Sequence, residues 1–151
     1  MNKSVFRGPA ATSVGEMTGE MTDLRSDPDH LVFVHLHHVQ LAIPSGGEGE
    51  CRAFWRDVLG MHELEKPPVL AARGGCWFRS GGVEVHLGVE EDFEPARKAH
   101  PSFLVARIDD VAARLLASGT DVTWDDAFPG HRRFYAADPF GNRLEFLQPV
   151  D

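Results

Sequence analysis

Four side chains in this sequence have types and positions suited to binding a transition-metal ion: His38, His86, His100 and Glu145. Successive side chains of a β-strand point to opposite faces. In three apolar segments, His38, His86 and Glu145 each lie on the face opposite the apolar packing residues, and His100 directly precedes a fourth such segment. Imidazole ligands favour Zn, Ni, Fe or Co over Mg. The residue types therefore predict a divalent transition-metal site.

The spacing of these residues links them in pairs. His38 and His100 are 62 residues apart, and His86 and Glu145 are 59 residues apart. If two stretches of chain fold alike about a pseudo-two-fold, both pairs converge on one point. Taken singly, each histidine is more typical of a hydrogen-bonded core or surface residue. An inward-facing Glu145 needs a cation or strong donors, because burying an unpaired carboxylate is costly, and Arg143 on the same face is the alternative partner.

The elements that must position these side chains begin with a predicted strand over residues 31–43, which a Pro-Ser-Gly-Gly turn ends. Apolar residues at 3.6-residue periodicity predict a helix over 48–59, which Gly60 ends. Three further strands are predicted at 61–66, 76–80 and 83–89. This order is βαβββ.

The same order recurs in the second part of the chain. A helix capped by Asp109 or Asp110 ends at Gly119. The strands around it are predicted at 101–108, 121–124, 133–136 and 143–148. The sequence thus predicts an α+β fold of two βαβββ modules, at about 31–90 and 99–149, that form a curled mixed sheet around a metal cavity.

Composition narrows the class of protein. The chain has 151 residues, of which 42% are hydrophobic, and this is typical of one soluble globular domain. Residues 1–30 are polar and predict a disordered tail before a domain over 31–149. The net charge of −8 argues against nucleic acid and anionic membranes as partners, and no apolar run is long enough to span a bilayer. Two cysteines without metal or redox spacing favour a cytoplasmic location.

Four segments together resemble the vicinal oxygen chelate superfamily: 37–44, 54–61, 100–105 and 138–146. This superfamily includes glyoxalase I, fosfomycin-resistance enzymes, extradiol dioxygenases and bleomycin-resistance proteins. The resemblance implies a glyoxalase-like fold of paired modules and a metal ion that substrate oxygens chelate. It also implies a homodimer with ligands donated across the interface.

The resemblance implies metal ligands at His38, His100 and Glu145. Strand register places His86 at the fourth position, where glyoxalase-like members have a carboxylate. Glu84 lies one step earlier on the same face, and either residue could face the ion. His86 is thus a fourth ligand or a proton shuttle, and Glu145 doubles as the candidate base.

Three residues are candidates for substrate binding: Tyr135, Arg133 and Gln40. Tyr135 and the segment up to Glu145 are similar to the closing half of an extradiol dioxygenase motif, although the upstream histidine is missing at the matching distance. Arg133 could bind an anionic substrate. Core packing of Tyr135 and a solvated Arg133 are the plain alternatives, and Gln40 shares the face of His38.

The leading hypothesis is a glyoxalase-like metalloenzyme of lyase or isomerase type, in which a divalent ion (Zn, Ni, Fe, Co or Mn) binds a small oxygen-chelating organic substrate. One alternative is an extradiol-type dioxygenase that requires Fe(II) or Mn(II). Another is a metal-free antibiotic-binding resistance protein. The remaining histidines His35 and His37 fall on the face opposite His38 and are interpreted as surface or interface residues.

Overall fold

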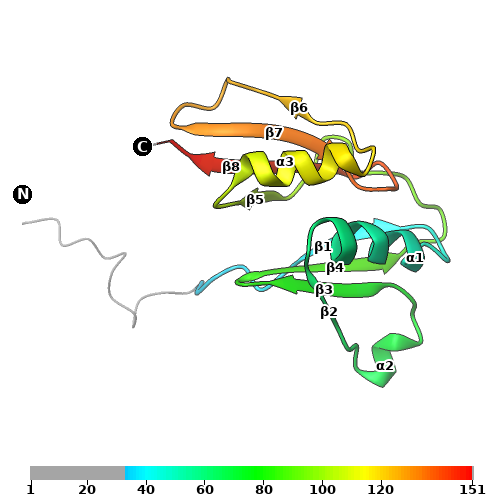
Figure 1. Cartoon of the computed structure of the whole chain (residues 1–151). Helices are drawn as coiled ribbons and strands as arrows, with labels where there is room; N and C mark the ends of the chain where they lie inside the picture. The colour runs from blue at the N-terminus through cyan, green and yellow to red at the C-terminus, as the bar shows by residue number, and fades with distance from the viewer. Residues whose placement is uncertain (1–32, 151) are drawn as a thin grey trace, which may run out of the picture. The chain divides into compact units, whose positions relative to one another are not determined.

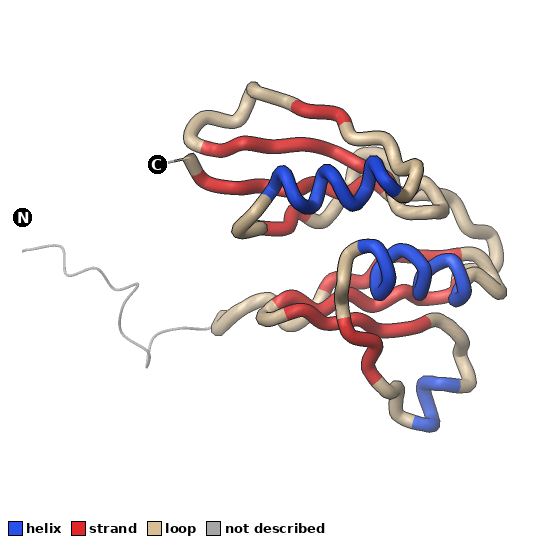
Figure 2. Tube along the Cα trace, in the orientation of Figure 1, coloured by secondary structure: helices blue, strands red, loops and turns tan. Residues whose placement is uncertain are grey.

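The computed structural model describes residues 33–150 (Figures 1 and 2). The expected tail over residues 1–30 lies outside them. The described part holds two four-stranded mixed sheets with few helices, and the sheets are not closed into a barrel. The predicted α+β fold of two modules with mixed sheets is therefore confirmed. Within residues 33–150, every helix is too short or too polar to cross a membrane.

The first sheet has the strand order β1-β4-β3-β2, with bounds β1 (Val39–Ile43), β4 (Val83–Val89), β3 (Cys76–Ser80) and β2 (His62–Leu64). β1 pairs with β4 in parallel, and the other two pairings are antiparallel. α1 (Glu48–Cys51) continues directly into the π-helical segment η2 (Arg52–Val58). Cys51, Phe54 and Trp55 of this helix are buried, as the apolar periodicity predicted.

The predicted strand over 31–43 is too long, because β1 begins only at Val39. The register pairs Val39 with Val85, and β4 itself begins at Val83 after the Gly81-Gly82 turn. Residues 33–36 therefore have no β4 residue to pair with. The short helix α2 (Pro68–Ala71) was not predicted; its proline at the first helical position suits the start of a helix.

The second sheet has the order β5-β8-β7-β6, with bounds β5 (Ser102–Leu104), β8 (Arg143–Pro149), β7 (His131–Ala137) and β6 (Thr123–Trp124). In Figure 1, α3 (Ile108–Ala117) lies along β8. The predicted aspartate cap is wrong, since Arg107 is the residue before the helix and makes no side-chain cap. The side chain of Gln148 accepts the Ile108 N–H at 2.8 Å instead. The predicted strand over 101–108 is also too long, since β5 ends at Leu104 and α3 begins at Ile108.

Strand register confirms the duplication. In the first sheet Gln40 of β1 is paired in parallel with His86 of β4, and in the second Ser102 of β5 is paired in parallel with Glu145 of β8. The two predicted ligands His86 and Glu145 therefore take equivalent places in their modules. Each sits on the central strand that joins a parallel and an antiparallel partner.

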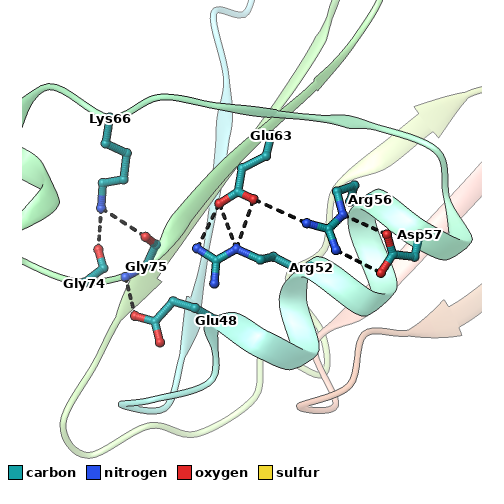
Figure 3. Close-up of polar contacts among 8 residues, drawn as sticks. All are labelled: Glu48, Arg52, Arg56, Asp57, Glu63, Lys66, Gly74 and Gly75. Atoms are coloured by element: carbon teal, nitrogen blue, oxygen red, sulfur yellow. Dashed lines mark hydrogen bonds and ion pairs between the residues drawn. The ribbon is translucent and has the colours of Figure 1, made fainter.

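Polar contacts hold α1 and η2 to the rest of the first module (Figure 3). Arg52 Nε donates to both carboxylate oxygens of Glu63 on β2, each at 3.0 Å. At the start of α1, Glu48 Oε1 accepts the backbone N–H of Gly75 at 2.7 Å. This hydrogen bond lowers the pKa of Glu48 and ties the helix to the loop before β3.

Gly75 has no room for a side chain. Its φ is +77°, and a Cβ built on it would lie 2.0 Å from the carbonyl oxygen of Leu87. We expect Gly75→Ala to lower the free energy of unfolding by about 2–3 kcal/mol, measured by urea denaturation. Gly49→Ala is the control, because its Cβ meets nothing within 4 Å and alanine favours a helix by roughly 0.5–1 kcal/mol. Equal midpoints for the two variants would contradict the close approach.

Candidate functional site

The first cluster of predicted site residues is a stack of three rings. His86 is buried on β4, and its ring lies between those of Trp77 and His38. The ring centroids are 4.0 Å apart for Trp77 and 3.9 Å apart for His38, with interplanar angles of 5° and 17°. Trp77 is directly paired with His86 across the β3–β4 ladder, so strand register alone produces this half of the stack.

A buried carboxylate positions the central ring of the stack. Glu84 Oε1 lies 2.7 Å from His86 Nε2, and Arg79 Nε donates to Glu84 Oε2 at 2.9 Å. Hydrogen bonds from His86 and Arg79 hold the pKa of Glu84 down at about 2. Burial lowers the pKa of His86 and favours its neutral ring, an effect that Glu84 only partly offsets. Glu84 is therefore ionised. Arg79 balances its charge at one oxygen, and the other oxygen orients His86.

His37 does not lie away from His38 as strand alternation predicted. The Nδ1 atoms of the two rings are 2.9 Å apart, and both side chains line the same cavities. The alternation fails because both residues precede β1, where the backbone is not held in a sheet. His35 is exposed, in keeping with its interpretation as a surface residue.

The second cluster pairs His100 with Glu145. The Nδ1 atom of His100 lies 2.7 Å from the carbonyl oxygen of Lys98, and since a carbonyl only accepts, this nitrogen carries the proton. The other ring nitrogen, Nε2, faces Glu145 Oε2 at 3.4 Å. In this tautomer of a neutral ring, Nε2 and the carboxylate oxygen would both present lone pairs, whereas a second ring proton would let Nε2 pair with Glu145 directly. Their approach favours a cation or proton between them.

The separation of these two atoms fits neighbouring metal ligands. Ligand atoms about 2.1 Å from a tetrahedral ion are roughly 3.4 Å apart, and 3.4 Å is the observed distance between His100 Nε2 and Glu145 Oε2. The bond from His100 Nδ1 to a backbone carbonyl is the kind that orients metal-binding histidines. The donor set and the observed distance therefore fit a divalent transition metal.

Arg133 is the guanidinium partner of Glu145, and Arg143, the alternative partner considered from the sequence, is not. Its Nη1 donates to Glu145 Oε1 at 3.0 Å, and its Nη2 donates to Asp125 Oδ1 at 2.6 Å. Arg143 instead lies over the ring of Tyr135, 3.9 Å from its centroid. Because two carboxylates already neutralise Arg133, its role as a substrate-binding residue stays a prediction.

Glu145 is held in its ionised form. Burial is the largest influence and would raise its pKa, but hydrogen bonds from Ser102, Arg133 and Tyr135 together outweigh it and lower the pKa. The ring of His100 also contacts Tyr135 edge-on, with centroids 5.7 Å apart. Tyr135 is thus part of the second cluster, although its contact with a substrate stays a prediction.

The two clusters border one cavity of about 860 Å³. Its lining includes His38 and Gln40 from the first module and His100 and Ser102 from the second. Within residues 33–150, no three His, Cys, Asp or Glu side chains form a group that could hold a metal ion. The structure thus joins His38 with His86 and His100 with Glu145, and the meeting of all four at one ion stays a prediction.

The sequence of residues 35–146 matches the family model of the glyoxalase/bleomycin resistance protein/dioxygenase superfamily. The chain belongs to this superfamily. A glyoxalase family protein from Bacillus anthracis is 47% identical to the chain; the match covers 78% of this chain and 97% of that one, with a TM-score of 0.76. This membership confirms the resemblance stated from the four sequence segments.

Other glyoxalase-superfamily structures share the fold at lower identity. A lactoylglutathione lyase from Agrobacterium tumefaciens is 20% identical with a TM-score of 0.62, over 78% of this chain and 96% of that one. TnmS3, an antibiotic binding protein from Streptomyces sp. CB03234, has the same identity and TM-score over 80% and 100% of the two chains. No curated protein matches the chain.

Sequence reasoning missed two residues that contact the candidate site residues, Trp77 and Arg79. Both lie on β3, whose bounds were predicted correctly. Pairing the predicted strands 76–80 and 83–89 as a hairpin about Gly81-Gly82 would have placed Trp77 opposite His86 and Arg79 opposite Glu84. Only the register was needed to find them.

Proposed function

We propose that the protein is a glyoxalase-like, metal-dependent enzyme that acts on a small organic substrate with two chelating oxygens. The observation that supports this most strongly is the approach of His100 Nε2 and Glu145 Oε2 to 3.4 Å, with the proton of His100 committed to a backbone carbonyl. A divalent ion bound there would act as a Lewis acid on the substrate oxygens.

His100 and Glu145 would supply two ligands and His38 the third. His38 borders the same cavity as His100 but belongs to the other module. We propose a homodimer in which the modules of two protomers complete each site, with the third ligand coming from the partner. Sedimentation or light scattering should then show a dimer in solution.

Proton movement is assigned to side chains held beside the cavity. Glu145 is ionised, and its Oε2 is the candidate proton acceptor. The neutral ring of His86 is oriented by Glu84 at 2.7 Å and stacked between two other rings. His86 is therefore suited either to bind the ion as a fourth ligand or to relay a proton.

Metal-free binding of a flat antibiotic is the second candidate function. The stack of Trp77, His86 and His38 favours it, because stacked aromatic rings provide a surface for a planar ligand. The likeness in fold to TnmS3 gives this alternative a known example. The net charge of −8 suits a cationic drug.

Metal analysis of protein purified without a histidine tag separates the candidates. After Zn, Ni, Fe(II) or Mn(II) is offered, we expect about one bound ion per chain by mass spectrometry of the metal. Absence of stoichiometric metal would contradict the enzyme and favour the antibiotic-binding protein. Ring cleavage of catechol when dioxygen is added to the anaerobically loaded Fe(II) form, but no lyase or isomerase activity with Zn or Ni, would instead identify an extradiol-type dioxygenase.

A further inference from the structure

A second cavity of about 500 Å³ adjoins the first, because His37, His38, Gln40 and Glu84 border both. Two cationic side chains, Lys66 and Arg73, line only the smaller one. Among the described residues that line it, the single carboxylate is Glu84, which is already paired with Arg79 and His86. In a protein of net charge −8, this cavity is therefore locally positive.

Lys66 is held in place at the edge of the ring stack. Its ammonium donates to the carbonyl oxygens of Gly74 and Gly75 (Figure 3) and lies 5.8 Å from the centroid of the Trp77 ring. The Gly75 N–H is anchored in turn by Glu48. Both hydrogen-bond acceptors of Lys66 are neutral carbonyl oxygens. Glu48 is close enough for the charge of Lys66 to lower its pKa, but within residues 33–150 Lys66 forms no ion pair with a carboxylate.

Within residues 33–150, the guanidinium of Arg73 has no hydrogen-bond or ion-pair partner. Its side chain is exposed. By contrast, Arg52 and Arg133 are each bound by carboxylates. A guanidinium without a carboxylate partner and a fixed ammonium that line one cavity are suited to bind oxyanions such as carboxylate or phosphate.

We infer that the substrate carries an oxyanion group remote from its chelating oxygens, and that Lys66 and Arg73 bind this group in the smaller cavity. The chelating end would lie at the metal ion that His38 helps to bind, and the smaller cavity adjoins this histidine. Only the position of the chelating end rests on the proposed function. The anion site depends on Lys66 and Arg73 alone.

Three ligands that differ only at one end test this inference: 3,4-dihydroxybenzoate, 3,4-dihydroxyphenylphosphonate and the neutral 3,4-dihydroxybenzamide. Their dissociation constants are measured by calorimetry on the full chain, both metal-free and with Zn. We expect at least one of the two anions to bind about tenfold more tightly than the amide in both forms, which corresponds to about 1.4 kcal/mol. The better anion identifies the group as carboxylate or phosphate-like.

Arg73→Gln should reduce this preference to within about twofold while leaving the affinity for the amide and the circular dichroism spectrum unchanged. Arg107→Gln is the matched control, because Arg107 is exposed, paired with Asp110 and outside both cavities. Equal binding of anions and amide by the parent protein, or a preference that persists in both Arg73→Gln and Lys66→Gln, overturns the inference. If Zn strengthens no ligand while the anion preference persists, the proposed function fails and the anion site stands.

Discussion

Replacing Glu145 with glutamine should lower the affinity for zinc by about 100-fold or more. Glutamine keeps the shape of the side chain but removes the charge that faces His100 Nε2 at 3.4 Å. Loss of residues that merely orient metal ligands already costs roughly 10–100-fold, so loss of a charged ligand should reach or exceed the upper end. Competition with a zinc chelator measures the dissociation constant.

The fold should survive this change, because the amide oxygen of glutamine can still accept the hydrogen bond from Arg133. Glu63→Gln is the matched control: it makes the same chemical change on β2, where Glu63 pairs with Arg52 outside the described cavities. Full zinc affinity is expected for that variant. Equal zinc affinity in Glu145→Gln and the parent protein would remove Glu145 from the ligand set.

Replacing Asn142 with alanine should lower the free energy of unfolding by about 3–5 kcal/mol. Asn142 is 1% exposed, and its side chain bonds three separate segments. Its Nδ2 donates to the carbonyl of Ala42 and to Asp138, each at 2.8 Å, and its Oδ1 accepts the N–H of Ala96 at 3.0 Å. The alanine variant leaves these three groups without this partner.

Gln148→Ala provides the comparison for Asn142→Ala. Gln148 is half-buried, and its side chain makes a single described bond, to the N–H of Ile108 at the start of α3. Its loss should cost about 1 kcal/mol. Urea denaturation of both variants tests the difference. Similar destabilisation in the two variants would contradict the importance of the three-way bonding at Asn142.

Local signals were sufficient to predict most of the fold from the sequence. The strands 76–80 and 83–89 match β3 and β4, because the glycine pair between them leaves little freedom in where the hairpin turns. Errors arose where a boundary depends on a distant partner. β1 is shorter than predicted because β4 begins at Val83, and α3 is capped by Gln148, which lies 40 residues further along the chain.

The candidate site was predictable to the extent that strand register positions it. Equivalent spacing singled out His86 and Glu145, and the ladders place them at equivalent positions. Lys66 could not be found in this way, because its position depends on a loop in which Gly74 and Gly75 both have positive φ. The spacing of residues along the sequence also could not show that Arg133, and not Arg143, binds Glu145.

The outer edges of both sheets have a consequence for behaviour at high concentration. β2 has three residues and β6 only two, and each is the last strand of its sheet. Such short strands expose few free backbone donors and acceptors, so another chain gains little by adding a strand there. Fibril growth from these two borders should therefore be slow, and concentrated solutions should resist gelation that begins at them.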